Sequence, residues 1–279
     1  MKTFEFKVWE EISDMRMSDY LKSKLGLSTS LITAVKFGGV RLNGEVVTMR
    51  ARVSGGDVVS ITFPDEKSEN IEPIEMPLDI LYEDEHTLAV NKPRGMATHP
   101  ARGTPLPTLA NGVSRYLGCD FVFRAINRLD TGTAGIVLIA KNPLAAAVLG
   151  RAMKERKIKK YYTALVDGIP TEREGEISAP IAREQEGNIK RVVRNDGKAA
   201  LTKYRVTKTI EGNAVCEIEL LTGRTHQIRV HFAHIGHALV GDFLYGTPND
   251  DGYRLTCHKL VFPHPITKDE ITVEAPTDF

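Results

Sequence analysis

A chain of 279 residues, 42% hydrophobic and 26% charged, has the composition of folded globular proteins and enough length for two domains, which excludes a disordered chain. The net charge of +1 hides an uneven distribution that suits a polyanionic partner: residues 65–85 carry nine Asp and Glu against one Lys, whereas residues 86–279 carry 27 Lys and Arg against 20 Asp and Glu. No apolar run has the length of a membrane span and the charged N-terminus is unlike a signal peptide, so we expect a cytoplasmic protein without a membrane partner.

Residues 1–64 predict a small domain of two short helices and a hairpin. The stretch SDYLKSKLG predicts one helix, and STSLITAVKFGG predicts a second helix that Ser28 caps and the glycines end. The Asn-Gly pair in VRLNGEVV predicts a two-residue hairpin turn. The stretch GDVVSITF predicts a strand because its apolar residues are mostly β-branched.

This arrangement resembles the alpha-L RNA-binding motif found in small-subunit ribosomal protein four, over roughly residues 15–63. The resemblance implies that the helix pair meets RNA phosphates. The residues that would make these contacts are Arg16, Lys22, Lys24, Lys36 and Arg41. Short basic helices are also common as solvated surface, so a face without a partner is the alternative.

Residues 65–79, with the sequence DEKSENIEPIEMPLD, predict an acidic linker. They are polar, they carry two prolines and they show neither a helical nor a strand period. We therefore expect a second domain to begin near residue 80.

Residues 80–279 predict a mixed α+β domain built on an extended sheet, because strand-like runs outnumber helical ones. The strand-like runs are TLAVNKP, GIVLIAK, YYTALVDG, ALTKYRVT, VCEIELLT and ITVEAP. One helix is predicted for NPLAAAVLGRAMKERK, in which Asn142 is the cap and Pro143 the first helical residue.

The stretch INRLDTGTAGIVLIAK, residues 126–141, places Asp130 between Arg128 and a Thr-Gly turn that leads into an apolar strand. An Asp before Thr-Gly can close a loop by bonding its own backbone. It can also be a nucleophile or an acid–base group, since a turn at a strand end is a frequent place for function. The stretch alone leaves both interpretations open.

Four stretches of residues 80–279 together resemble the RluA/RluD group of RNA pseudouridine synthases. They are NKPRGMATHPARG, NRLDTGTAG, KKYYTALVDG and LTGRTHQIRVHFAHIGHALVGDFLYG, and the tail HPITKDEITVEAP adds support. The resemblance implies the fold of that family, an extended, largely antiparallel mixed sheet with flanking helices and loops. It also implies an isomerase that detaches the base of a flipped-out uridine from ribose, turns it and rejoins it through a ring carbon. Such a reaction needs no metal or other cofactor.

The resemblance implies that Asp130 is the catalytic residue and that Tyr162, Arg229 and Arg128 contact the substrate. The carboxylate could attack the sugar, attack the base or remove a ribose proton, and the sequence does not separate these roles. A charge in a pocket that excludes water requires a cationic partner, which the family supplies from the position of Arg229. Tyr162 rather than Tyr161 would stack on the base, because alternation along a strand points the two rings to opposite faces.

Two residues depart from the family pattern. Asn127 stands where the family usually has His, and Ala134 stands where it usually has Ser or Thr. The departures affect hydrogen bonding around the site, and so rate or substrate choice rather than reaction type.

RNA is the expected partner, with large-subunit ribosomal RNA favoured as substrate, transfer RNA as the alternative and a monomer as the default state. The basic stretches RAMKERKIKK and NIKRVVRNDGK would add phosphate contacts that set affinity. A protein with this fold that binds RNA or assists ribosome assembly without catalysis is a second alternative.

A metal hydrolase is a third alternative, because histidines crowd into the stretch HQIRVHFAHIGH. These histidines are His226, His231, His234 and His237. We expect no metal, because no carboxylate accompanies them at ligand spacing and the cysteines Cys119, Cys216 and Cys257 form no Cys-x-x-Cys pair.

Overall fold

The computed structural model describes residues 2–66, 71–101, 104 and 107–277, and within them the N-terminal part has its own small sheet. The strand order is β1 (Lys2–Lys7), β6 (Val58–Phe63), β3 (Val40–Leu42) and β4 (Glu45–Val46). Strands β2 (Met15–Arg16) and β5 (Arg52–Val53) pair separately. The helical segments are α1 (Met17–Asp19), the π-helical η1 (Tyr20–Lys24) and α2 (Thr29–Val35).

The helix cap and the hairpin turn predicted for this N-terminal unit are both confirmed. The Ser28 hydroxyl accepts a hydrogen bond from the Leu31 amide at 3.2 Å and so caps α2. Asn43 and Gly44 both have positive φ, 50° and 87°, as a tight hairpin turn requires. The strand β1, which was not predicted, adds an edge to the sheet by pairing antiparallel with β6.

A large mixed sheet forms the rest of the chain, with nine strands in the part that the structure describes. The order is β11 (Glu174–Ser178), β14 (Leu201–Ile210), β15 (Asn213–Leu220), β10 (Lys159–Val166), β16 (Leu255–Pro263), β9 (Ala134–Ala140), β8 (Thr87–Lys92) and β7 (Asp79–Glu83), with β17 (Glu270–Glu274) paired to β16. The pair β9–β16 is parallel and the other pairs are antiparallel. The predicted α+β architecture with a largely antiparallel sheet is confirmed.

Three helices and a hairpin flank this sheet within the described residues: α3 (Leu109–Leu117), α4 (Pro143–Lys154), α5 (Gln227–His234) and the hairpin β12 (Ile181–Arg183) with β13 (Arg191–Val193). Helix α4 begins as predicted, because the Asn142 side chain accepts a hydrogen bond from the Ala145 amide at 2.8 Å. Of the helices described, none is long and apolar enough to cross a membrane.

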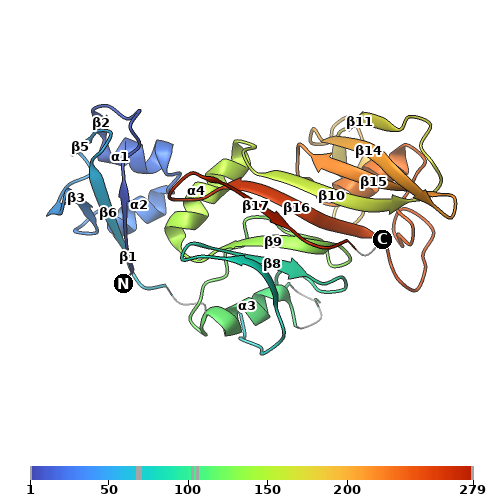
Figure 1. The fold of residues 1–279 in the computed structure, drawn as a ribbon, viewed down its shortest axis with the longest axis horizontal. Coiled ribbons are helices and arrows are strands. Elements are labelled where there is room, and N and C mark those ends of the chain that lie inside the picture. Colours follow the sequence, from blue (N-terminus) through green and yellow to red (C-terminus); the bar gives the residue numbers. More distant parts are fainter. Residues whose placement is uncertain (1, 67–70, 102–103, 105–106, 278–279) are drawn as a thin grey trace.

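Helix α4 joins the two parts of the molecule. Its residues Leu144 and Val148 belong to the hydrophobic core of the N-terminal unit, whereas Leu149 and Ala152 belong to the core of the large sheet. Figure 1 shows α4 between the N-terminal unit and the large sheet. The N-terminal unit is therefore held against the rest of the chain by a shared helix.

The segment predicted as an acidic linker lies partly on the large domain. The Ile74 amide donates to the Asn111 carbonyl at 3.2 Å, and Asn111 in turn donates from its side chain to the Glu72 carbonyl at 2.7 Å, so this stretch packs on α3. Residues 71–78 contain neither helix nor strand. Residues 67–70 of the predicted linker lie outside the described residues.

Candidate active site

Asp130 lies in the loop that leads into β9, with its side chain 34% exposed. The Thr133 amide donates to the Asp130 backbone carbonyl at 3.0 Å, so a turn is present, but the backbone closes it rather than the Asp130 side chain. The Asp130 backbone thus closes the turn, and its carboxylate remains available for other contacts.

Asn127 anchors this loop to the sheet. Its side-chain amide donates to the Ile136 carbonyl at 2.9 Å and its side-chain oxygen accepts from the Leu138 amide at 2.8 Å. Asn127 is buried, so both of its polar ends need such partners. The Asn127 side chain therefore fixes the start of the loop on β9.

Gly135 allows β9 to approach β16 closely where the two strands pair in parallel. Its φ is 106°, and a Cβ atom there would lie 2.2 Å from the Cys257 carbonyl oxygen. A residue other than glycine at this position would push the strands apart. The close approach thus fixes β9, the strand that follows the Asp130 loop, beside β16.

Arg229 on α5 approaches Asp130 but is bound more tightly elsewhere. Its Nη1 lies 4.0 Å from Asp130 Oδ2, so the structure brings the predicted cation and carboxylate together. The stronger partner is Asp242, which accepts from Arg229 Nε and Nη2 at 2.7 Å each. Burial alone would lower the pKa of Arg229, and the hydrogen bonds and charge of Asp242 outweigh it, so the guanidinium stays charged.

Asp242 was not singled out from the sequence, although it lies in the quoted stretch GDFLYG. It is fully buried and also accepts from the backbone amides of Leu244 and Tyr245 at 3.0 and 3.3 Å. These four donors satisfy a buried carboxylate, which is otherwise costly. Asp242 therefore orients Arg229 and shapes the following loop at the same time.

Three aromatic rings surround the Arg229 guanidinium. Its Cζ lies 4.2 Å from the Tyr253 ring centre, 5.0 Å from Tyr245 and 5.5 Å from Phe243. Burial, and secondarily the Asp130 charge, raises the pKa of Tyr253 to about 12, so this hydroxyl stays protonated. Phe243 differs from the other two because its side chain is 62% exposed, which places an apolar ring at the rim of the site.

His226 is a second neighbour of Asp130 that the sequence did not assign to this site. Its Nε2 lies 3.9 Å from Asp130 Oδ2, and its Nδ1 is 2.8 Å from the Tyr245 hydroxyl. Its backbone has φ 58°, and this left-handed residue immediately precedes α5. Burial lowers the pKa of His226 and the nearby Asp130 opposes that effect, with the net result that the imidazole is neutral at pH 7.

Lys92 at the end of β8 is buried beneath the site. Its Nζ donates to the carbonyls of Pro93 at 2.9 Å, Met96 at 2.7 Å and Thr131 at 3.4 Å, so it ties the loop after β8 to the Asp130 loop. Burial lowers the pKa of Lys92 to about 7, although the Asp130 charge acts in the opposite direction. Lys92 lies in the quoted stretch NKPRGMATHPARG, but nothing in that pattern indicated its burial.

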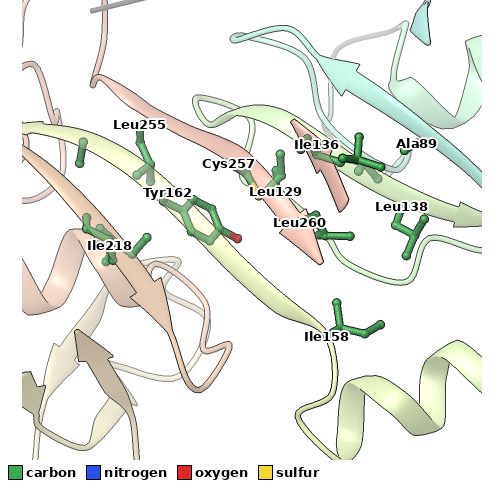
Figure 2. Packing of buried hydrophobic residues seen from close by; sticks show 14 of the residues in the cluster. Ala89, Leu129, Ile136, Leu138, Ile158, Tyr162, Ile218, Leu255, Cys257 and Leu260 are labelled. Carbon is green, nitrogen blue, oxygen red and sulfur yellow. The ribbon is translucent and has the colours of Figure 1, made fainter. Parts of the chain in front are cut away.

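Tyr162 lies in the core on β10 and is 6% exposed, whereas Tyr161 is partly exposed, as the expected alternation requires. Figure 2 shows the Tyr162 ring among Ile218, Leu255, Cys257 and Leu129. Burial raises the pKa of its hydroxyl well above the usual value, and Cys257 and, to the smallest extent, the Asp130 charge act in the same direction. Tyr162 is therefore beneath the Asp130 loop rather than on the open surface.

Arg128 is exposed and makes no hydrogen bond or ion pair with the described residues. The candidate RNA contacts lie on the N-terminal unit, on β2, η1 and β3 and just after α2. Arg16, Lys22, Lys36 and Arg41 are exposed, and Lys24 is half-buried. Beside them Phe37 is 86% exposed, with the Lys36 ammonium 5.1 Å from its ring centre.

The crowded histidines have separate partners. His231 is 2.9 Å from both the Thr202 hydroxyl and the Ala179 carbonyl, and His237 is 2.9 Å from the Asp167 carbonyl. Across the described ranges no three His, Cys, Asp or Glu side chains gather closely enough to hold a metal ion. The geometry instead offers one accessible carboxylate beside a fixed cation and a neutral imidazole.

Comparison with known proteins gives consistent matches. The profile of a family described as RNA pseudouridylate synthase matches residues 86–234. The uncharacterized RNA pseudouridine synthase YjbO of Bacillus subtilis is 38% identical over 270 residues, 94% of this chain and 95% of that one. The ribosomal large subunit pseudouridine synthase D of Vibrio parahaemolyticus is 37% identical over 259 residues, 86% of this chain and 79% of that one. The solved structure of human RNA Pseudouridylate Synthase Domain Containing 1 matches with a TM-score of 0.63 at 28% identity, covering 75% of this chain and 87% of that chain.

Proposed function

The chain belongs to the RNA pseudouridylate synthase family and is an RNA pseudouridine synthase, an isomerase, and from this premise we propose that it acts on large-subunit ribosomal RNA with Asp130 as its catalytic carboxylate. The choice of RNA rests on relatives named ribosomal large subunit pseudouridine synthase D, 37% identical in Vibrio parahaemolyticus and 36% in Xylella fastidiosa. The assignment of Asp130 rests on its position beside Arg229.

The reaction is an internal rearrangement in which atoms balance. The bond between uracil N1 and ribose C1′ breaks, a bond between C5 and C1′ forms, the hydrogen on C5 leaves as a proton and N1 gains one. A carboxylate beside C1′ can serve this exchange as a nucleophile or as a base. In each role it must be ionised when the uridine arrives.

The arrangement of Arg229 favours such a carboxylate. Because Asp242 occupies two of its donors, Arg229 presents Nη1 to Asp130 at 4.0 Å rather than in a close two-bond pair. At that distance the guanidinium stabilises the charge and leaves the carboxylate oxygens free to react. This single relationship carries the assignment of Asp130.

We also propose that the N-terminal unit binds a structured part of the RNA. Its exposed Arg16, Lys22, Lys36 and Arg41 suit phosphate contacts, which set affinity and register rather than the choice of base. The helix pair and hairpin that it contains are the features on which its likeness to the alpha-L motif rests.

The substrate is tested by mapping pseudouridines in ribosomal and transfer RNA from cells that lack the protein. The cells are complemented with the wild type or with Asp130→Asn. We expect one or more sites in large-subunit ribosomal RNA to disappear and to return with the wild type alone. A change confined to transfer RNA would reject the proposed substrate, and no change in either RNA pool would reject the proposal that these RNAs are targets.

A further inference from the structure

A cavity of about 920 Å³ lies where the N-terminal unit meets α4 and the turn between β16 and β17. It is lined by the end of β1 and the residues after it, by Lys24 of η1, by the C-terminal half of α4 and by residues 263–268. We call it the junction cavity. It is separate from Asp130, which does not line it.

The junction cavity has more cations than its own carboxylates neutralise. The lining carries five cations, Lys7, Lys24, Arg151, Lys157 and Lys268, against three carboxylates, Glu10, Glu11 and Glu155. Glu10 pairs with Lys7 at 3.3 Å, and Glu155 pairs with Arg151 Nε at 2.6 Å and with Lys157 at 2.9 Å. Lys24 and Lys268 also line the cavity, and neither forms an ion pair with a carboxylate of the described residues. The wall therefore keeps positive charge that an anion could meet.

Arg151 supplies a donor without an acceptor. Its Nη1 is buried and has no hydrogen-bond partner among the residues described, although its Nε is paired. A buried donor left unbonded is costly, so native proteins seldom retain one without a reason. Because this atom has almost no accessible surface, a phosphate in the cavity reaches it only when the Arg151 side chain turns toward the ligand. A guanidinium presents several donors in one plane, which suits the oxygens of a phosphate.

Lys268 has an unfavourable backbone conformation and lies near the positive charges of Lys157 and Arg151. Its backbone has φ 70°, which is uncommon for a residue with a side chain. Its ammonium donates to the Pro265 carbonyl at 2.7 Å and lies 4.5 Å from the ring centre of Trp9. Burial lowers the pKa of Lys268 to about 8, and the charges of Lys157 and Arg151 act in the same direction. A bound anion would relieve this crowding.

We propose that the junction cavity binds a phosphate group through Arg151, Lys268 and Lys24. On the proposed function, this is a backbone phosphate of the RNA substrate, and the strand runs from the N-terminal unit onto the catalytic domain across the shared helix α4. Free phosphate carries the same oxygens, and the experiment separates the two sources.

The chain provides its own probe, because Trp9 is its single tryptophan and lines the cavity. Trp9 fluorescence of the full-length enzyme is followed during titration with inorganic phosphate and, separately, with a single-stranded RNA oligonucleotide. The variants are Arg151→Gln and Lys268→Gln. The matched control is Lys208→Gln, because Lys208 is an exposed lysine of β14 that does not line the cavity and lies outside both basic stretches. Circular dichroism checks that each variant is folded.

We expect a saturable Trp9 signal with RNA that inorganic phosphate competes away. Each cavity variant should weaken RNA binding and flatten the dependence of log K on log salt by about 0.7 for each phosphate that the protein no longer neutralises, whereas the control should do neither. A signal with phosphate alone would retain the site and assign it to free phosphate. No signal with either ligand, or equal effects of cavity and control variants, would overturn the proposal.

Isomerase activity on ribosomal RNA is measured in parallel with the wild type. If that RNA is not isomerised while the phosphate signal at Trp9 persists, the proposed RNA target is wrong and the cavity assignment stands. If the RNA is isomerised and Trp9 does not respond, the cavity assignment alone fails.

Discussion

Arg229 and Asp242 form a doubly hydrogen-bonded ion pair in which the two side chains are 3% and 0% exposed. The pair connects α5 to the loop that carries Phe243 and Tyr245, and it fixes the direction in which Arg229 faces Asp130. The position of the cation in this candidate site is therefore set by a carboxylate that does not itself take part in the proposed chemistry.

Replacing Asp242 should affect stability as well as activity. In Asp242→Ala the buried guanidinium loses its partner, and breaking a buried pair in this way typically costs roughly 3–5 kcal/mol. We expect a lower urea midpoint and a reduced kcat, because Arg229 is free to turn. The exposed pair of Lys203 and Glu176 serves as the control, and Glu176→Ala should change stability by less than about 1 kcal/mol. Equal urea midpoints for Asp242→Ala and the wild type would contradict this account.

Lys92 predicts a specific dependence of stability on pH. Its pKa falls from 10.5 to about 7 on folding, so between these values the unfolded chain binds more protons than the folded chain. The free energy of unfolding should then rise with pH in that window, with a contribution of at most about 1.4 kcal/mol per pH unit from this group. Urea unfolding at several pH values between 7 and 10 measures the slope. Lys92→Met should have a smaller slope than the wild type, and identical slopes would show that Lys92 does not titrate in this way.

Phe243 should contribute to RNA binding more than to chemistry. The ring is 62% exposed beside the guanidinium of Arg229, and stacking of a base on an aromatic ring is worth roughly 1–3 kcal/mol. We expect Phe243→Ala to raise KM by about tenfold with little change in kcat, and Phe243→Trp to restore KM. Ile169→Ala is the control, since Ile169 is another exposed apolar residue. A fall in kcat at unchanged KM would argue against stacking.

The N-terminal cations should govern the salt dependence of binding. Changing Lys22 and Lys36 together to Gln should flatten the slope of log K against log salt and weaken RNA binding, because each phosphate contact releases counterions. Point variants are preferable to removal of the unit, since removal would expose Leu144 and Val148 of α4. The exposed Lys208 again provides a control. An unchanged slope in the double variant would exclude these two residues as phosphate contacts.

Elements with local chemical signals could be predicted from the sequence. The caps Ser28 and Asn142, the turn at Asn43 and Gly44, and the strand β9 follow from short-range preferences that tertiary contacts did not override. Strand β1 was missed although its burial alternates. Strand β16 was missed because it is buried along most of its length and lacks the alternation of a half-exposed strand.

Some residues of the candidate site were named from the sequence. Asp130 and Arg229 were named from the resemblance to a known family, and the structure places their side chains close together. His226, Asp242 and Tyr253 were not named as site residues. The roles of His226 and Tyr253 depend on contacts between segments about one hundred residues apart, as between His226 and Asp130. The role of Asp242 depends on its burial against Arg229, and hydrophobic periodicity does not predict the burial of a loop residue.

The most direct test of the central claim is the release of tritium from RNA labelled at uracil C5, because the new bond from C5 to ribose displaces that hydrogen. Purified wild type and Asp130→Asn are compared on large-subunit ribosomal RNA transcripts, with folding and RNA affinity measured for both. The account predicts release by the wild type and a loss of about 10²-fold or more in the variant at unchanged affinity. Release by a folded Asp130→Asn protein at a rate close to that of the wild type would contradict it.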